Sequence, residues 1–323
     1  KDEYENLAGL PAFKADPFVI EILVSSQSLI NVESYEHSYP HCWRHKTPLI
    51  FTSTPQWFIS MDKADLLNDA KASIDSVNWE PSWGLQRIKS MLEDRPDWCI
   101  SRQRNWGVPI ALVVHKDSGE IHPNQDNLFN IFADLIEESG VAVWDSVKLS
   151  DYIDDADNYI KITDTLDVWF DSGATHFSVL EKRFQKGLIA DLYLEGSDQH
   201  RGWFQSSLLT SIAINGRPPY KEVLTHGFVV DDKGRKQSKS LGNVVSPQKV
   251  WNSLGADILR LWVAATDFRS EMNASDEILK RVSDQYRRIR NTFRFLLGNL
   301  NDFDIEKNGV DFDKLIELDK WIL

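Results

Sequence analysis

The chain has 323 residues, 42% of them hydrophobic and 26% charged, which is enough for more than one globular domain with a substantial core. No apolar run is long enough to span a bilayer and the polar start differs from a signal peptide, so we expect a cytoplasmic protein with no membrane partner. The net charge of −13 argues against indiscriminate nucleic-acid binding, although local basic patches can hold a specific nucleic acid. Two cysteines are too few for a disulfide scaffold, and their number agrees with a reducing compartment.

The first part of the chain has short elements. The pair Asp16-Pro17 predicts the start of a helix over 18–26, because proline is tolerated best in a first turn. Alternating side chains predict a strand over 29–35. A buried strand region, interrupted by Pro55, is expected over 47–59.

Between these elements lies a group of possible zinc ligands: His37, His41, Cys42 and His45. No second cysteine pair follows at a spacing that suits zinc. We therefore expect a packed or hydrogen-bonded cluster and no metal site.

The middle of the chain combines helices with short strands. Helices are predicted over 63–76, 83–92 and 127–139, and a strand over 111–114. The acidic stretch 151–157 is expected to be a solvated surface.

Arginines and tryptophans are interleaved over 97–109, and they include Arg102, Arg104 and Trp106. Such a pattern contacts a nucleic acid or a substrate by stacking and charge, or it forms an arginine–tryptophan stack within the fold. The segment 164–173 then joins a strand to several carboxylates. Carboxylate pairs can exchange protons with a substrate, but capping and salt bridging are commoner roles.

A short buried strand over 192–194 precedes Glu195-Gly196-Ser197-Asp198-Gln199-His200, and an apolar helix follows over 203–213. Open α/β sheets bind ligands at such strand–turn–helix corners, at the carboxyl ends of their strands. The polar groups here can hold an ammonium group, a ribose and a nucleobase. Ordinary helix capping by Ser197 or Asp198 is the alternative.

A strand predicted over 223–230 leads into a basic loop whose four cations are Lys233, Arg235, Lys236 and Lys239. The loop also contains glycines and the hydroxyls of Ser238 and Ser240, so it can move and donate hydrogen bonds to a polyanion. Ser246-Pro247 predicts a helix start directly after it. A strand, a basic loop and a helix in this order favour phosphate binding over a merely solvated hairpin.

The last part of the chain is helical. Helices are predicted over 247–253, closed by Gly255, over 257–265, and as a long helix after the cap Ser275. On the long helix an apolar stripe is expected to pack in the core: Tyr286, Ile289, Phe293, Leu296 and Leu300. A second stripe faces solvent or phosphates: Arg287, Arg290 and Arg294.

Seven segments in order resemble bacterial isoleucyl-tRNA synthetases, which are class I aminoacyl-tRNA synthetases. They cover almost the whole chain from about residue 10: 37–40, 42–48, 54–58, 97–109, 164–173, 194–203 and 236–243. The corner Gly196 to Trp203 is similar to that of the isoleucine enzymes rather than the valine or leucine enzymes.

The resemblance implies an α/β fold: the second half of a Rossmann-type parallel sheet with insertions, followed by an all-helical segment. It assigns 1–45 to the tail of an editing insertion and 46–235 to the catalytic sheet with a connective insertion. Residues 236–282 then carry a KMSKS-type loop and a stem-contact fold, and 283–323 begin an anticodon-binding domain.

The resemblance also implies roles for individual residues. Lys239, assisted by Lys236, matches the lysine that binds ATP phosphates in the family. Residues expected to bind ATP or the adenylate are Glu195, Gly196, Asp198, Gln199, Ser238, Lys239 and Ser240. Gln199 and Trp203 match the wall of the amino-acid pocket, and Arg102, Arg104 and Trp106 are candidate tRNA contacts.

The implied reaction is the ATP-dependent activation of L-isoleucine and its transfer to tRNA(Ile). ATP is expected with Mg²⁺, without zinc in this part of the chain, and the complete enzyme as a monomer. Gln237 stands where the family usually has methionine, and no His-Ile-Gly-His-type motif is present in the sequence. We therefore expect an internal fragment that does not activate an amino acid alone.

Three other interpretations stay open. A valine- or leucine-specific relative is disfavoured by the corner at 199–203. A non-catalytic tRNA-binding module would bind tRNA in a salt-dependent way without binding nucleotide. A general nucleotide-binding α/β domain would be indifferent to the amino-acid side chain.

Overall fold

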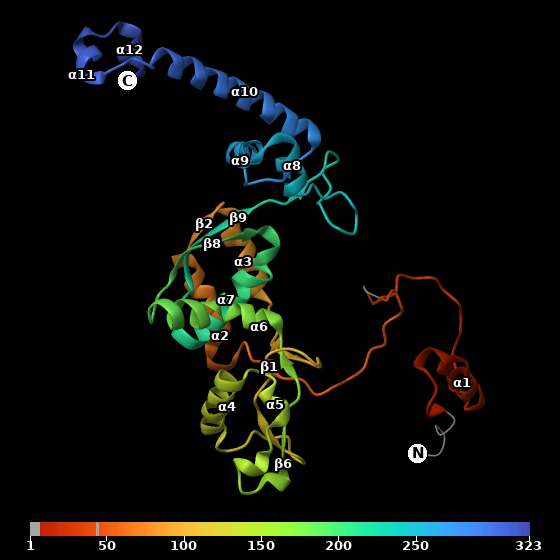
Figure 1. Ribbon diagram of the computed structural model, residues 1–323. Helices are drawn as coiled ribbons and strands as arrows, with labels where there is room; N and C mark the ends of the chain where they lie inside the picture. The colour runs from red at the N-terminus through yellow and green to blue at the C-terminus, as the bar shows by residue number, and fades with distance from the viewer. Residues whose placement is uncertain (1–6, 43–44) are drawn as a thin grey trace. The chain divides into compact units, whose positions relative to one another are not determined.

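The computed structural model describes residues 7–42 and 45–323, and the chain divides into two compact units, Lys1–Gln56 and Trp57–Leu323. The first unit contains helix α1 (Ala12–Ser25; Figure 1). Its predicted start at Asp16-Pro17 is wrong, because Pro17 lies inside the helix. Since proline has no N–H to donate, α1 lacks one backbone hydrogen bond there.

Two strand predictions in the first part of the chain are also wrong. Residues 28–40 have no regular structure, and the side chain of Ile30 is fully exposed. In the region 47–59 only β1 (Phe58–Ile59) is a strand, and residues 47–55 are exposed. An alternating pattern forms a strand only where a partner strand takes its backbone hydrogen bonds, and neither segment has one over most of its length.

The second unit is a mixed α/β structure around a parallel sheet. Three strands lie in the order β2-β9-β8, and both pairs are parallel: β2 (Asn78–Glu80), β9 (Tyr220–His226) and β8 (Ala190–Gly196). Trp79 and Tyr193 are both in register with Val223 of the central strand. All three strands therefore end at the same edge, where the polar side chains of residues 197–200 follow β8.

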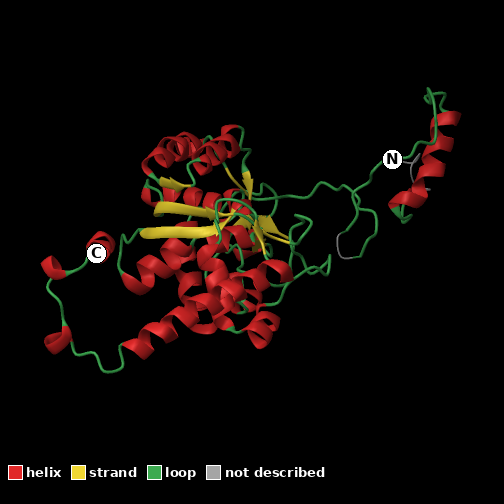
Figure 2. Ribbon diagram, turned by 90° about the horizontal axis from the view of Figure 1, so that it is seen from above, coloured by secondary structure: helices red, strands yellow, loops and turns green. Residues whose placement is uncertain are grey.

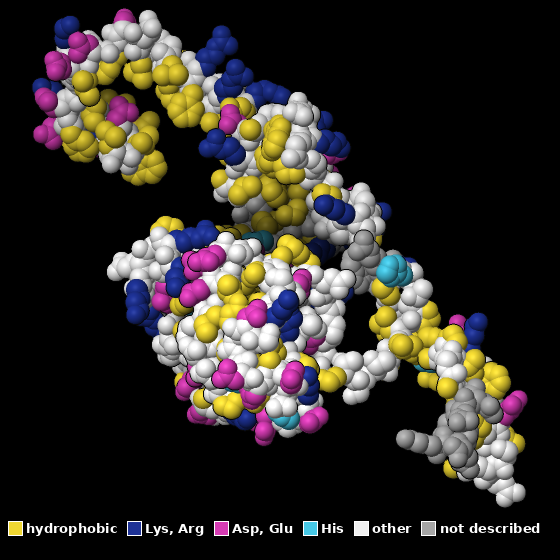
Figure 3. Space-filling view, turned by 60° about the horizontal axis from the view of Figure 1, so that its bottom comes forward, with side chains coloured by type: hydrophobic (Ala, Val, Ile, Leu, Met, Phe, Trp, Pro, Cys, Tyr) yellow, Lys and Arg dark blue, Asp and Glu magenta, His cyan; other side chains and the backbone are white. Residues whose placement is uncertain are grey.

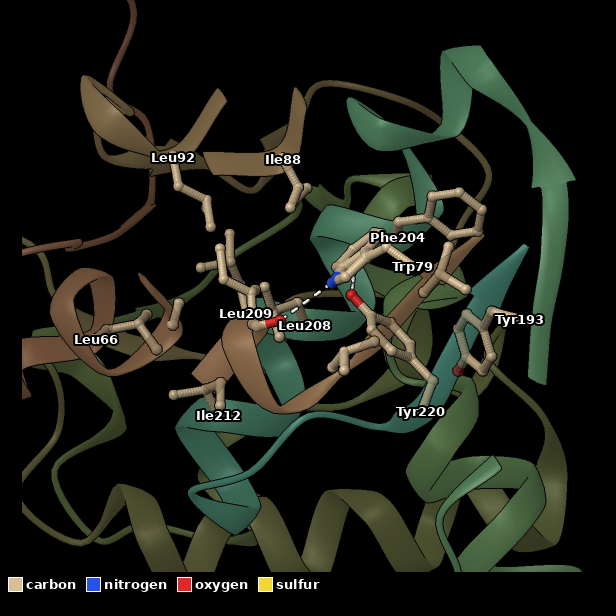
Figure 4. Packing of buried hydrophobic residues seen from close by; sticks show 14 of the residues in the cluster. Leu66, Trp79, Ile88, Leu92, Tyr193, Phe204, Leu208, Leu209, Ile212 and Tyr220 are labelled. Carbon is tan, nitrogen blue, oxygen red and sulfur yellow. Dashed lines mark hydrogen bonds between the residues drawn. The ribbon is translucent and has the colours of Figure 1, made fainter. Parts of the chain in front are cut away.

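Helices lie on both sides of these strands (Figure 2). The main hydrophobic core joins the sheet to α2 (Leu66–Ser73), α3 (Trp83–Glu93) and α7 (Trp203–Asn215). Figure 4 shows this core, in which two aromatic side chains donate hydrogen bonds to backbone carbonyls. The Trp79 indole donates to the carbonyl of Ile74 at 3.0 Å, and the Tyr220 hydroxyl donates to that of Phe204 at 3.0 Å.

The prediction of a buried strand over 192–194 holds for only one of its two faces, because β8 lies at the edge of the sheet. Tyr193 is buried, but its neighbours Leu192 and Leu194 are 44% and 51% exposed. Since neighbouring side chains of a strand point to opposite faces, β8 is buried on the face of Tyr193 and about half exposed on the other, at the edge of the sheet.

A second cluster is built after β9. It packs the pair β10 (Val229–Val230) and β11 (Met272–Asn273) with α8 (Pro247–Leu254), α9 (Ala256–Ala265) and the start of α10 (Asp276–Asn299). Ser246 and Ser275 precede α8 and α10 as predicted, and the Ser275 hydroxyl accepts the N–H of Ile278.

The predicted core packing of the long helix is wrong for most of its length. In α10 the buried residues are Leu279 and Val282, near its start. Farther along, Ile289, Phe293 and Leu296 are about half exposed. In Figure 3 apolar side chains line one side of this helical segment, with lysines and arginines on the other. An amphipathic pattern fixes which face is apolar, but only a neighbouring element can cover it.

A third cluster forms an insertion between β4 and β7. It contains α4 (Gln125–Ser139), α5 (Val143–Ser146), β5 (Val113–His115) and β6 (Tyr159–Lys161). The acidic stretch 151–157 lies largely at its surface, as expected.

Short elements complete the unit. The remaining strands pair as β1 with β3 (Trp98–Cys99) and β4 (Ser101–Arg102) with β7 (Thr165–Leu166). The remaining helices are η2 (Lys63–Asp65), η3 (Ile74–Ser76), η4 (Leu149–Asp151), η5 (Ala156–Asn158), α6 (Val168–Gly173), η6 (His176–Phe184), η7 (Ser197–His200), α11 (Ile305–Asn308), η8 (Phe312–Lys314) and α12 (Glu317–Ile322). Among the described residues, no helix is long and apolar enough to cross a membrane.

Candidate functional site

The carboxyl end of β8 forms a tight corner. The chain passes from the exposed Glu195 through the buried Gly196 into η7 and then α7. A Cβ atom on Gly196 would lie 2.9 Å from Oδ1 of Asp198, so a larger residue would push this carboxylate away. Glycine at this position leaves room for the Asp198 carboxylate to lie against the strand end.

Gln199 and Trp203 hold the corner against the sheet. Oε1 of Gln199 accepts the backbone N–H of Trp203 at 3.0 Å, which satisfies one of the free donors at the start of α7. The Trp203 ring stacks on Tyr193 at a centroid distance of 3.9 Å, and its indole N–H donates to the carbonyl of Ser172. The structure thus places both predicted pocket residues together, on rigid supports.

His200 is a feature that the sequence analysis did not single out. Its side chain is fully buried among Trp79, Trp83 and Phe204. Nδ1 lies 3.1 Å from the carbonyl of Ser197, so Nδ1 donates, while the buried Nε2 has no partner in the structure. Burial lowers the pKa of His200, so its imidazole is held neutral. Nothing in a local pattern distinguishes such a histidine from a surface one.

The basic loop after β10 is organised by one carboxylate. Oδ1 of Asp231 accepts the backbone N–H groups of Lys233 and Arg235 at 3.0 and 2.9 Å. Oδ2 accepts the Arg235 guanidinium at 2.8 Å and the Asn243 amide at 3.0 Å. These donors, the Asn243 amide first, hold the pKa of Asp231 well below its usual value.

Asn243 and Gln237 close the far side of the loop. Oδ1 of Asn243 accepts the backbone N–H of Ser238 at 2.9 Å, and Oε1 of Gln237 accepts that of Val245 at 3.0 Å. A thioether is a weak acceptor, so methionine at 237 would not replace this bond equally. The hydroxyls of Ser238 and Ser240 lie 3.2 Å apart.

The two catalytic candidates of the loop have different surroundings. Nζ of Lys236 lies 3.5 Å from the centre of the Phe228 ring, in a cation–π contact. The same ring comes within 3.8 Å of the point where a Cβ on Gly196 would lie. Lys236 therefore stands next to the corner. Lys239 is exposed, and among the described residues its side chain has no ion pair.

The arginine–tryptophan segment separates into two parts. Arg102 binds the buried Asp167 at 2.9 Å and donates to the carbonyls of Cys99 and Ser101, so it is engaged within the fold. Arg104 and Trp106 are exposed and line a hollow of about 530 Å³ beside the insertion. Their contact with tRNA stays a prediction.

Asp167 also serves as a cap, since its carboxylate accepts the N–H of Trp169 at the start of α6. This is the commoner of the two roles considered for the carboxylates of 164–173.

Within the described ranges 7–42 and 45–323, no group of three or more His, Cys, Asp or Glu side chains could hold a metal ion. Sγ of Cys42 instead lies 3.5 Å from Nδ1 of His45. Trp43 and Arg44, part of one family-like segment, lie outside the described residues.

A comparison with protein families identifies this arrangement. Residues 22–275 match the family described as tRNA synthetases class I (I, L, M and V). The chain belongs to this family. The match includes the corner after β8 and the basic loop, so the features described above lie in the part of the chain that defines the family.

Two similar class I synthetases are isoleucine–tRNA ligases. That of Teredinibacter turnerae is 59% identical over 322 residues, which are 99% of this chain and 34% of the relative. That of Ruthia magnifica is 58% identical, again over 99% of this chain, and 35% of its own length is covered. The chain thus spans about a third of the length of the curated relatives it matches.

Solved structures are less similar. A Mycobacterium tuberculosis methionyl-tRNA synthetase in complex with methionyl-adenylate is 21% identical, with a TM-score of 0.47 over 75% of this chain and 39% of its own. This similarity is too low to carry an argument, and the family assignment depends on the sequence match.

Proposed function

We propose that this chain is part of an isoleucine–tRNA ligase that activates L-isoleucine with ATP and transfers it to tRNA(Ile). The observation that carries the proposal is the placement of the ordered basic loop next to the corner after β8. Phe228 joins them, with Lys236 on its ring and Gly196 beside it. The identity of 58–59% with isoleucine–tRNA ligases supports isoleucine as the amino acid.

In the first step a carboxylate oxygen of isoleucine attacks the α-phosphorus of ATP, and the bond to the β-phosphate breaks. Pyrophosphate leaves and isoleucyl-adenylate remains. In the second step a ribose hydroxyl at the 3′ end of tRNA attacks the carbonyl carbon, and AMP leaves. Mg²⁺ accompanies ATP as part of the substrate.

The chain's own residues position and stabilise these groups. The corner at Gly196 receives the adenylate, with Glu195, Asp198 and Gln199 around it, and Trp203 forms a wall of the amino-acid pocket. Lys236 and Lys239, with Ser238 and Ser240, meet the charge that develops on the phosphates. Catalysis by positioning and charge is the main source of rate in such transfers.

The architecture supports a Rossmann-type sheet that other parts of the complete enzyme extend. β8 pairs with β9 alone in this sheet, so its other edge can accept a further strand. The exposed stripe of α10 agrees with the start of an anticodon-binding domain, and residues 1–45 with the tail of an editing insertion. A monomeric enzyme of the cytoplasm completes the proposal.

The test is ATP–pyrophosphate exchange with isoleucine, valine and leucine. We expect the chain to need an amino-terminal half of an isoleucine–tRNA ligase for exchange, and isoleucine to give the highest rate. Lys239→Ala should lower the rate about 100-fold or more, since removing one charged group at a transition state costs this much. The KM for isoleucine should change far less.

Lys233→Ala is the matched control, because Lys233 lies in the same loop and contributes only its backbone N–H to the network. It should retain most of the rate. Equal losses in both variants would contradict the role of Lys239. No exchange in a folded, reassembled pair that binds tRNA would favour a non-catalytic tRNA-binding module.

A further inference from the structure

A second hollow, of about 490 Å³, opens beside the corner and is basic. It lies between the end of α3 and the start of α7, and it is lined by Arg87, Ser90, Met91, Asp94, Arg95, Pro96, Arg201 and Gln205. We call this cavity the arginine hollow, after Arg87, Arg95 and Arg201 in its lining. None of the three belongs to the basic loop or to the segment 97–109.

Arg95 is held in a fixed position. Its Nη1 donates to Oε1 of the buried Gln205 at 2.5 Å, and the Gln205 amide in turn donates to the carbonyl of Met91. The guanidinium also lies 5.6 Å from the centre of the Trp98 ring. Such a planar donor, fixed in advance, loses little entropy when it binds an oxyanion.

The positive charge of this hollow is not neutralised. Among the described residues, no carboxylate lies within ion-pair distance of Arg87, Arg95 or Arg201, although the exposed Asp94 shares the lining. Nε of Arg95 is buried and has no hydrogen-bond partner. Burial lowers the pKa of Arg95, which means that its charge is costly without an anion nearby.

The hollow adjoins the turn that follows the corner, through Arg201. Arg201 follows His200 directly, and a smaller hollow shares Arg95, Arg201 and Gln205 with Trp169 and Gly202. A nucleotide chain whose terminal ribose reaches the corner must pass its last phosphates close by. Guanidinium groups bind phosphate oxygens in pairs of parallel hydrogen bonds.

We propose that Arg87, Arg95 and Arg201 form a binding site for backbone phosphates of the single-stranded 3′ end of an RNA. This inference rests on the proposed function, which supplies tRNA as the RNA. The same chemistry would also accept pyrophosphate or the phosphates of ATP, so the test must separate these sources.

The test measures binding of labelled tRNA(Ile), and of an unrelated single-stranded tetranucleotide, to the full chain at 50–200 mM salt. We expect Arg87→Gln and Arg201→Gln each to weaken binding of both about three- to ten-fold. Each should also reduce the slope of log K against log salt by about 0.7, the value for one single-strand phosphate contact. Both side chains are exposed, so the fold should persist, which melting curves check.

Arg183→Gln is the control, because Arg183 is exposed and lies outside the arginine hollow. If Arg87→Gln and Arg201→Gln lose no more RNA affinity than this control, the proposal is overturned. Binding of tRNA by all these proteins would still leave the proposed function intact. Arginine-dependent binding of the tetranucleotide without a preference for tRNA would support the phosphate site and contradict the proposed function.

The last arm measures competition by pyrophosphate and ATP. Variants that lose affinity for these two but keep the wild-type salt slope with RNA would overturn the assignment to RNA phosphates. The assignment would be supported if the variants bind pyrophosphate and ATP as the wild type does, while the salt dependence of their RNA binding is reduced. Failure of the wild-type chain to bind either RNA at 50 mM salt would overturn the phosphate site, whereas the proposed function is tested separately by ATP–pyrophosphate exchange in the reassembled pair.

Discussion

At the scale of single residues, Asp231 orders the basic loop. Its two oxygens accept bonds from the backbone or side chains of Lys233, Arg235 and Asn243. A loop of many cations repels itself, and one carboxylate at its base offsets this repulsion. The lysines proposed to meet ATP are thereby held on a defined backbone.

Asp231→Asn should therefore loosen the loop. We expect trypsin to cleave after Lys233, Arg235 and Lys236 at least several-fold faster than in the wild type, because the variant loses charged acceptors. Asp232→Asn is the matched control, since Asp232 is exposed and lies outside the network. Identical cleavage rates in the two variants would show that Asp231 does not order the loop.

The loop should also resist acid. Because the pKa of Asp231 is lowered in the folded state, its stabilising contribution is present above the usual aspartate pKa. It is lost only as the pH falls through the folded-state value. Carboxyl-carbon NMR should show Asp231 still ionised at about pH 4, where an ordinary aspartate is half protonated. A midpoint at the ordinary value would contradict the network.

At the scale of elements, the connection from β9 to β10 depends on a close backbone approach. The N–H of Gly227 donates to the carbonyl of Phe268 at 2.8 Å. A Cβ atom on Gly227 would lie 2.0 Å from the backbone oxygen of Ser270, so no side chain fits there. This approach links β9 to the segment that leads into β11.

Gly227→Ala should lower the free energy of unfolding by about 2 kcal/mol or more, because the backbone must move to accept the methyl group. Gly298→Ala is the comparison: Gly298 lies in α10 with nothing near its Cβ position, and alanine favours a helix. Thermal melts should show a lower Tm for the first variant and an unchanged or higher Tm for the second. The opposite order would contradict the packing at Gly227.

At the scale of the whole molecule, three hydrophobic clusters hold the second unit together. All their buried members follow residue 57: the first surrounds the parallel sheet, the second α8 to α10, and the third α4 and α5. The described residues of the first unit, 7–42 and 45–56, contribute none of them. Stability of the second unit should therefore come from its own residues.

A chain of residues 57–323 should then melt like the full chain, with a Tm within about 2 °C, a difference equivalent to under roughly 1 kcal/mol. Differential scanning calorimetry at equal concentrations makes the comparison. Phe204→Ala supplies the positive control, because Phe204 is fully buried and its removal costs about 3–5 kcal/mol. A Tm drop in the shorter chain as large as in this control would mean that residues 1–56 belong to the same cooperative unit.

Much of the local structure follows from the sequence alone. The helices after Ser246 and Ser275 begin where caps and proline predict them, and Gly255 ends α8 as expected, because these signals act over one turn. The corner after β8 and the cations of the basic loop were found in the same way. Gly196 and Gly227 lack the Cβ atom that would collide with Asp198 and with the backbone of Ser270.

Only the tertiary structure decided which patterns found a partner. The stretch 29–35 has the alternation of a strand and lacks a neighbour, and the stripe of α10 is apolar and largely uncovered. Residues far apart in the chain meet in the pairing of Arg102 with Asp167, in the burial of His200 between Trp79 and Trp83, and in the arginine hollow. Local propensity is encoded within a few residues, whereas burial and pairing depend on segments that only the folded chain brings together.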